Sequence, residues 1–248
     1  MVSLHDVTTE VVVSLGAVDQ LVGAAEPVDA TAETRQALAT VPRVSGLESI
    51  VMAQPSLVLG LQVIETADPD LLRRLREEGI AVRLFSLANL SDVYAMTRQI
   101  GAQVGRAAAA NALVQTLAGQ VEEASASPRR RLRVFVYDCC DPPFTAGRQT
   151  VLNEMIARAG GQNIFADLDA AWAHVTWEDV VSRTPEFVVI HAYAHAGQGD
   201  VDAKGAMLRR FPSLAQLPTT VLPLGCSLGG LRSAEGVQRL QAAWGARL

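Results

Sequence analysis

The sequence predicts an α/β protein of two lobes, each with a mainly parallel sheet, bridged by a single long α-helix. Short β-branched runs alternate with amphipathic stretches along the chain, which is the pattern of βαβ units with parallel strands. The alternation is interrupted once, by a proline-free stretch of about thirty residues with helical apolar spacing. A chain of 248 residues, 49% of them apolar, is long enough for two such units.

The first lobe is expected over residues 1–89. Leu72 and Leu75 share one helical face there while Arg73 and Glu77 take the other, as a helix that covers a sheet requires. The strands of this lobe are predicted at Val2–Leu4, Leu21–Ala24, Leu57–Leu59 and Ala81–Phe85.

The bridging helix is expected over residues 90–127. Val93, Met96 and Ile100 begin a series of apolar residues at three- and four-residue spacing that continues to about Ala124. At about 1.5 Å per residue, such a helix is a rod of roughly 50 Å, well beyond the average helix of a globular protein.

The second lobe is expected over residues 128–248, where the alternation of strands and helices begins again. Gly160 and Gly161 supply a helix stop inside it. Its strands are predicted at Arg133–Tyr137, Phe187–Ile190 and Thr220–Leu224, and its helices at Thr150–Ala159, at Trp177–Arg183, at Val201–Phe211 and from Ser233 to the end.

Charge and hydropathy exclude several classes of protein. The 21 basic and 26 acidic residues leave a mildly acidic surface, without the basic field that recruits nucleic acid or anionic lipid. No apolar run approaches the roughly 18 residues that span a bilayer. The opening Met1–Leu4 has no secretory leader, so we expect either a cytosolic protein or, as the favoured alternative, the mature part of a periplasmic or otherwise extracytoplasmic one.

Unusual side chains follow the predicted strands, where ligands bind in open parallel sheets. Imidazoles, thiols and acids are concentrated in these loops, which are expected to face one cleft between the lobes. The predicted ligand-binding residues from the loops are His5, Asp6, Leu61, Asp138, His191 and Tyr193, and the predicted metal ligands are His5, Cys139, Cys140, His191, His195 and Cys226.

Thiolates and imidazoles are the ligands that zinc, copper, cobalt and haem iron prefer, so this clustering indicates a metal. No standard zinc motif is present. The alternative is that Cys139 and Cys140 pack as small apolar residues, that Cys226 does likewise or bridges to one of them, and that the histidines are solvated. His174 lies apart, in an irregular stretch before a helix.

Enzyme motifs are missing. The chain has no Gly-x-Ser-x-Gly elbow, no phosphate-binding loop that ends in Lys-Ser/Thr, and no dinucleotide fingerprint. One enzyme hypothesis stays open as a remote alternative, a hydrolase that uses a cysteine nucleophile with a nearby histidine.

Several segments, in order along nearly the whole chain, resemble the periplasmic metal-chelate-binding proteins of ABC importers, which bind cobalamin, haem or ferric siderophores. The match is closest to the cobalamin-binding members. The segments that carry the resemblance are Val2–Leu4, Leu15–Ala17, Leu21–Gly23, Pro42–Ile50, Gln54–Leu59, Pro142–Gly147, Ala159–Phe165, Thr176–Val180 and Thr184–Glu186.

The resemblance implies roles for five residues. Glu48 and Glu178 match the acidic residues, one per lobe, by which such proteins dock on arginines of the permease. Phe144 and Trp172 match aromatic residues that line the cleft, and Arg232 falls near an arginine of the final loop. Charge complementarity of the docking kind fixes orientation and accelerates encounter.

The first lobe departs from the cobalamin pattern. Its segments Pro27–Asp29 and Pro42–Val44 lack the expected aromatic residues, and Leu61 replaces another. Because large flat macrocycles need aromatic walls, this weakens cobalamin itself as the ligand.

We therefore expect a monomeric, non-enzymatic receptor that captures a metal chelate and passes it to an ABC permease. It would need no catalytic cofactor, and would meet the membrane only through the permease or a lipid anchor. The alternative is a receptor that ligates a free transition-metal ion through the cleft His and Cys residues, which would make binding depend on pH.

Overall fold

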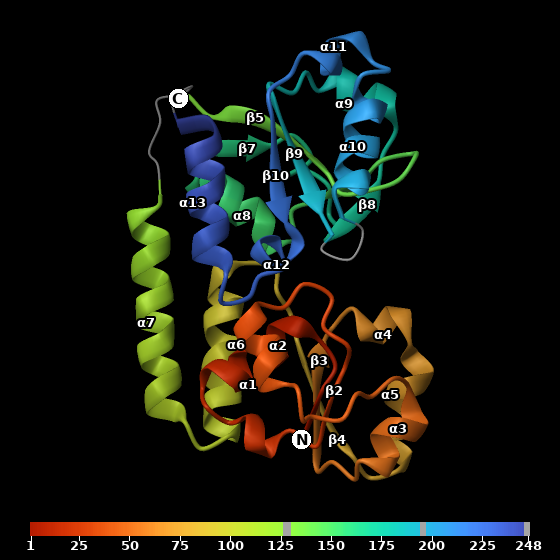
Figure 1. The fold of residues 1–248 in the computed structure, drawn as a ribbon. Coiled ribbons are helices and arrows are strands. Elements are labelled where there is room, and N and C mark those ends of the chain that lie inside the picture. Colours follow the sequence, from red (N-terminus) through yellow and green to blue (C-terminus); the bar gives the residue numbers. More distant parts are fainter. Residues whose placement is uncertain (126–129, 194–196, 246–248) are drawn as a thin grey trace. The chain divides into compact units, whose positions relative to one another are not determined.

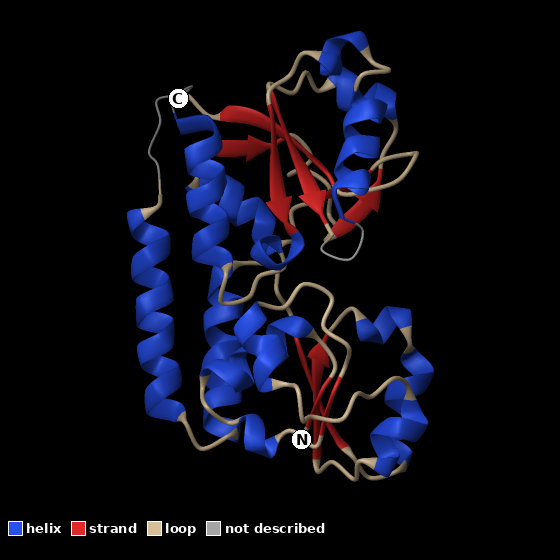
Figure 2. Ribbon diagram, in the orientation of Figure 1, coloured by secondary structure: helices blue, strands red, loops and turns tan. Residues whose placement is uncertain are grey.

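The computed structural model describes residues 1–125, 130–193 and 197–245 and divides into two compact α/β units (Figure 1). Unit 1 comprises residues 1–86 and 91–115, and unit 2 comprises residues 87–90 and 116–248. Both units contain a four-stranded parallel sheet with helices around it (Figure 2). The α/β class with parallel sheets is confirmed.

The sheet of unit 1 has the strand order β2-β1-β3-β4. The central strands are buried and β-branched or apolar, as expected for strands covered on both faces. The four predicted strands are confirmed at β1 (Val2–Ser3), β2 (Gly23–Ala24), β3 (Leu57–Leu61) and β4 (Ala81–Phe85).

Helices flank this sheet, with α1 and α2 on one side in Figure 1 and α3 to α5 on the other. A short 3₁₀ helix at Val18–Gln20 precedes β2. The α-helices before β4 are α1 (Asp6–Ser14), α2 (Ala32–Ala37), α3 (Leu47–Met52), α4 (Ile64–Ala67) and α5 (Pro69–Glu77).

Helix α5 illustrates how local sequence specifies an element. Asp68 accepts a hydrogen bond from the Leu71 N–H at 3.0 Å, and Pro69 occupies the first turn. Leu72 and Leu75 are buried, as their shared helical face predicts. The helix therefore begins at a cap and packs by its apolar stripe.

The sheet of unit 2 has the strand order β10-β9-β5-β7, and a two-stranded antiparallel ribbon, β6-β8, lies beside it. The three predicted strands are confirmed, whereas β6, β7 and β8 are additional. The strands are β5 (Leu132–Tyr137), β6 (Phe144–Ala146), β7 (Gly161–Asn163), β8 (Trp172–His174), β9 (Phe187–Ala192) and β10 (Thr219–Pro223).

Helices α8 and α13 lie on one face of the unit 2 sheet and α9 and α10 on the other (Figure 1). The aromatic rings of Phe135, Tyr137 and Trp177 contact one another in its core. The helices are α8 (Val151–Arg158), α9 (Trp177–Ser182), α10 (Gly197–Leu208), α11 (Pro212–Ala215), α12 (Leu224–Ser227) and α13 (Ser233–Trp244).

The single helix predicted over residues 90–127 is wrong: the chain forms two helices, α6 (Leu90–Gln103) and α7 (Ala107–Glu123). The chain enters unit 2 briefly at Leu87–Leu90, and it passes to unit 2 for the last time inside α7, between Gln115 and Thr116. Within the described ranges, no helix combines the length and the apolar character needed to cross a membrane.

The break between α6 and α7 is a glycine C-cap. Gly105 has a φ of +69°, and its N–H donates to the Ala102 carbonyl at 3.3 Å, while the Arg106 N–H donates to Gly101 at 2.7 Å. This pair of bonds is the Schellman motif. The two helices then pack so closely that a Cβ on Gly101 would collide with the Cβ of Ala110.

Candidate functional site

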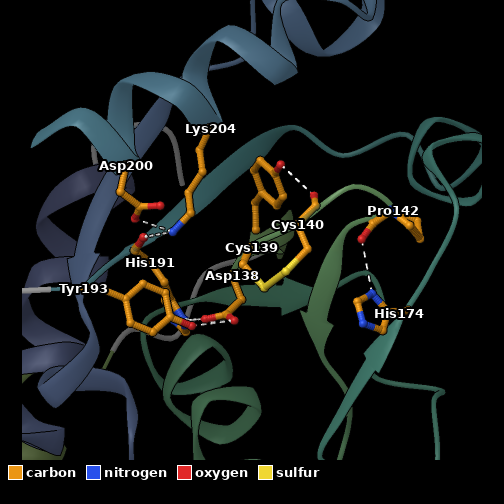
Figure 3. Close-up of a disulfide and its surroundings, with 10 residues drawn as sticks. Asp138, Cys139, Cys140, Pro142, His174, His191, Tyr193, Asp200 and Lys204 are labelled. Carbon is orange, nitrogen blue, oxygen red and sulfur yellow. Dashed lines mark hydrogen bonds and ion pairs between the residues drawn. A yellow bond between two sulfur atoms is a disulfide. The ribbon is translucent and has the colours of Figure 1, made fainter. Parts of the chain in front are cut away.

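The candidate site lies in unit 2, at the carboxyl ends of the neighbouring parallel strands β5 and β9 (Figure 3). Asp138 directly follows β5, and His191 is the penultimate residue of β9. Because parallel strands end at the same edge of a sheet, these two side chains meet there. The sequence had offered both as ligand-binding residues at strand ends, but it had not predicted their contact.

Asp138 is the centre of a buried polar network. Its Oδ1 accepts a hydrogen bond from His191 Nδ1 at 2.7 Å, and its Oδ2 accepts one from the Tyr193 hydroxyl at 2.7 Å. Lys204 Nζ donates to the His191 carbonyl at 2.8 Å and to Asp200 at 2.6 Å, and lies 4.8 Å from the centroid of the Tyr193 ring. One chain of contacts therefore joins five side chains.

The charges of this network favour an ionised Asp138. Burial acts to raise the pKa of Asp138, but hydrogen bonds from His191 and Tyr193 and the charge of Lys204 outweigh it, so the pKa is lowered. Burial and the nearby Asp138 charge raise the pKa of Tyr193, which keeps its hydroxyl proton as the donor. Within this network Asp138 therefore stays an acceptor, and the Tyr193 hydroxyl stays a donor.

Cys139 and Cys140, predicted as metal ligands, form a disulfide with each other. Their sulfurs are bonded and offer no thiolate, so this part of the predicted metal set is wrong. The Tyr137 hydroxyl donates to the Cys140 carbonyl at 2.9 Å, and burial raises the pKa of Tyr137 to about 12. A disulfide between adjacent residues was not among the pairings that the sequence suggested.

Cys226 does not join that disulfide. It is buried in α12, where Arg232 donates a hydrogen bond to its sulfur at 3.3 Å. Burial, partly offset by the Arg232 charge, raises the pKa of this thiol to about 11. Cys226 is therefore a protonated interior thiol, and its alternative role as a small packed residue fits the structure.

The ribbon β6-β8 carries an aromatic surface beside the network. Phe144 and Trp172 stack with centroids 6.0 Å apart and planes 21° apart, and His174 lies 4.8 Å from Phe144. The Trp172 ring also contacts His191 at 5.5 Å. We call Phe144, Trp172 and His174 the aromatic platform.

In unit 1, His5 and Asp6 follow β1 at the start of α1. His5 Nδ1 accepts a hydrogen bond from the Val7 N–H at 3.2 Å, and burial lowers the pKa of His5, opposed by the charge of Asp6. Asp6 accepts bonds from the N–H groups of the loop at Val28 and Asp29. Leu61 ends β3 and is half-buried.

The predicted docking residues both lie in the first turns of short helices, as expected. Glu48 is exposed in α3, and Glu178 is exposed in α9, where Thr176 and Asp179 form a capping box. Glu48 in unit 1 and Glu178 in unit 2 are thus exposed carboxylates at helix N-termini.

The six predicted metal ligands do not assemble in the part of the chain that the structure describes. Among residues 1–125, 130–193 and 197–245, no group of three or more His, Cys, Asp or Glu side chains is placed to hold an ion. His195 lies outside the described residues. The ligation of a free ion by Cys139, Cys140 and Cys226 is therefore not supported.

The sequence did not predict that Lys204 and Asp200 belong to the site, or that His174 contacts Phe144. A signal for Lys204 was available, because it is the only lysine in the chain, beside twenty arginines. It is 4% exposed, whereas lysines are almost never buried without a partner. His174 could not be placed, because its strand is three residues long.

The chain contains two α/β units, each with a parallel sheet, and polar and aromatic side chains gather at the carboxyl edge of the unit 2 sheet. This arrangement defines a two-unit ligand-binding fold. The chain belongs to the Periplasmic binding protein family, whose model matches residues 1–219.

Curated relatives are about a quarter to a third identical to this chain over the aligned residues. The ABC transporter substrate-binding lipoprotein YvrC of Bacillus subtilis is 26% identical over 76% of this chain and 62% of its own length. A vitamin B12-binding protein of Pectobacterium atrosepticum is 27% identical over 77% and 70%, and a cobalamin-binding protein of Halobacterium salinarum is 33% identical over 60% and 41%. The first of these matches spans less than two thirds of the relative.

Solved structures share the fold over nearly the whole chain. A periplasmic binding protein from Veillonella parvula superposes with a TM-score of 0.86 at 20% identity, over 98% of this chain and 89% of its own. An ABC-type Fe3+-hydroxamate transport protein from Saccharomonospora viridis gives 0.81 at 23%, over 98% and 92%. The heme-binding protein RhuT from Roseiflexus gives 0.79 at 22%, over 98% and 96%.

Proposed function

We propose that this protein is the solute-binding component of an ABC importer, and that it captures a metal chelate and delivers it to the membrane permease. Relatives named for vitamin B12 or cobalamin binding support a chelate of the cobalamin, haem or siderophore type. Binding and release complete the task, and the chelate is delivered without catalytic conversion.

The observation that carries this proposal is the aromatic platform at the carboxyl edge of unit 2. Phe144 and Trp172 are stacked on each other and half-buried, so their uncovered parts offer an aromatic, apolar surface beside the polar network of Asp138. Flat chelates with polar edges need a wall of this kind together with a few fixed hydrogen-bonding groups.

Unit 1 offers few aromatic side chains near its strand ends. Leu61 ends β3, and the segments at Val28 and Arg43 carry no aromatic residue. Because a corrin is a large flat macrocycle that needs aromatic walls, this lack weakens cobalamin itself as the ligand.

The proposed place of action is outside the cytoplasm. The Cys139–Cys140 disulfide supports this, because disulfides persist in oxidising compartments such as the periplasm and are rare in the cytosol.

The state of the cysteines disfavours the two competing functions. A free-ion receptor was expected to use cysteine thiolates beside histidines, and a cysteine hydrolase would use an activated thiol of lowered pKa. Cys139 and Cys140 are bonded together, and the pKa of Cys226 is raised to about 11. The cysteines therefore support neither alternative.

The test is to titrate the purified protein separately with cyanocobalamin, hemin and a ferric hydroxamate. Tryptophan fluorescence monitors the binding. We expect one chelate class to bind and to quench Trp172. Phe144→Ala should weaken that binding by about 1–3 kcal/mol, the scale of a buried aromatic contact. Val221→Ala, which truncates an exposed apolar side chain on β10, is the matched control and should bind normally.

Absorption spectroscopy and elemental analysis of protein from its native host would identify the class directly, because corrin, haem and ferric siderophore differ in colour and metal. Failure of every chelate to bind, together with a colourless and metal-free native protein, would refute the proposal.

A further inference from the structure

The hydrogen bonds of the described histidines decide which ring nitrogen of each offers a lone pair. In His5, Nδ1 accepts from the Val7 N–H at 3.2 Å, so the proton of the neutral ring is on Nε2. Neither nitrogen of His5 then offers a free lone pair. Binding a metal would require this histidine to abandon the cap of helix α1.

His191 has the opposite tautomer but no access. Its Nδ1 donates to Asp138 at 2.7 Å, which leaves the lone pair on Nε2. Nε2 has no hydrogen-bond partner among the described residues, and the side chain is 0% exposed. A bound molecule could reach this nitrogen only if the residues that bury His191 moved.

His174 combines the required tautomer with exposure. Its Nδ1 lies 3.2 Å from the Pro142 carbonyl oxygen, which can only accept, so Nδ1 carries the proton and Nε2 carries the lone pair. The residue is exposed on the ribbon. An imidazole whose Nδ1–H is fixed by a carbonyl is the usual arrangement of a metal-binding histidine.

The register of the ribbon places His174 beside the other two residues of the aromatic platform. Phe144 lies directly opposite His174, and Trp172 is two residues earlier on the same face of β8. The imidazole is tilted by 47° from the Phe144 ring rather than stacked on it, so it is not covered by that ring. A chelate in contact with Phe144 and Trp172 would therefore meet an imidazole whose Nε2 lone pair can bind a metal.

We propose that His174 coordinates the metal of the captured chelate through Nε2. The inference rests on the proposed function and adds to it the class of ligand, a metal macrocycle with an exchangeable axial position. The step is a ligand exchange, in which water leaves the metal as the imidazole binds, without change of oxidation state.

The test uses two probes, aquacobinamide and ferric haem, because both carry exchangeable axial water. For the probe that binds, the absorption spectrum of the complex should become that of an imidazole-ligated metal. His174→Ala should lose this spectral change and bind at least about ten-fold more weakly. Added free imidazole should restore the spectrum of the variant.

The matched control is Ala173→Ser, which changes the neighbouring residue of β8 on the opposite face. It should keep both spectrum and affinity. Phe144→Ala should weaken binding yet keep the imidazole spectrum in the fraction that binds, which separates stacking from coordination.

Other outcomes overturn the assignment in distinguishable ways. If wild type binds a probe with no imidazole spectrum, or if His174→Ala keeps that spectrum and His191→Ala loses it, His174 is not the ligand and the proposed function stands. If neither probe nor any other metal chelate binds the wild type, the proposed function and this inference fail together.

Discussion

At the scale of the residue, Asp138 is the group on which the unit 2 site depends. Its two oxygens accept hydrogen bonds from different donors, His191 and Tyr193, so neither oxygen is redundant. A carboxylate suits this position because both of its oxygens accept, whereas an amide has only one accepting atom.

We expect Asp138→Asn to lower the free energy of unfolding by about 1–3 kcal/mol at neutral pH, because one buried donor loses its acceptor. Tyr193→Phe, which removes a single hydrogen bond, should cost about 1 kcal/mol. Urea unfolding curves measure both. Equal stability of wild type and Asp138→Asn would contradict the central role of the carboxylate.

The difference in stability between wild type and Asp138→Asn should depend on pH. Because the pKa of folded Asp138 is lowered, its contribution to stability is present above the ordinary value of 3.8 and is lost as pH falls through the folded value. The stability difference between wild type and Asp138→Asn should therefore shrink on acidification below 3.8. A difference that stays constant with pH would mean that Asp138 does not titrate in this window.

The number of cysteines that react with iodoacetamide should depend on whether the protein is unfolded and reduced. We expect no labelling of the native protein, because Cys226 is buried and Cys139 and Cys140 are bonded together. Unfolding without reductant should expose one thiol, and unfolding with reductant should expose three, as counted by intact mass. Three thiols without reductant would show that the disulfide does not form.

At the scale of the element, the turn between α6 and α7 decides where the long helical stretch is broken. Apolar spacing continues through residues 90–124, and periodicity alone therefore predicts one helix. The break depends instead on the backbone of Gly105, whose positive φ disfavours any side chain.

Two glycine substitutions on this helix pair should act in opposite directions. Gly105→Ala should destabilise the protein by about 1–2 kcal/mol, because a Cβ is strained at φ +69°. Gly119→Ala, in the middle of α7 with open space around its Cα, should stabilise it by about 0.5–1 kcal/mol. Thermal unfolding measures both, and a gain in stability for Gly105→Ala would favour a continuous helix.

At the scale of the whole molecule, the elements that sequence predicted well are those with strong local patterns. The seven predicted strands are β-branched or apolar runs, and all seven occur. The expected parallel topology also drew attention to Asp138 and His191, because both lie at strand ends where ligands bind in such sheets.

The elements that sequence missed depend on contacts between distant segments. The ribbon strands β6 and β8 are each three residues long, and Phe144 pairs with His174, thirty positions further along the chain. Lys204 reaches His191 from another element. Such pairings leave no periodic pattern, so only the family resemblance pointed to Phe144 and Trp172, and nothing in the sequence placed His174 beside them.

At the same scale, delivery of the chelate to the permease should depend on contacts that both units make with it. Glu48 and Glu178 are exposed at helix N-termini, one in each unit, and match the docking residues of the resembled family. Charge pairs at an interface can contribute about 1.5–7 kcal/mol, so reversing both charges should reduce permease-coupled uptake at least about ten-fold.

The variant Glu48→Lys with Glu178→Lys should bind its chelate as tightly as wild type, because neither residue belongs to the platform or to the Asp138 network. The matched control is Glu78→Lys with Asp202→Lys, which makes the same change of charge at other exposed positions in the two units. If uptake falls equally in both double variants, net charge rather than docking is responsible. If it falls in neither, Glu48 and Glu178 only favour their helix termini electrostatically.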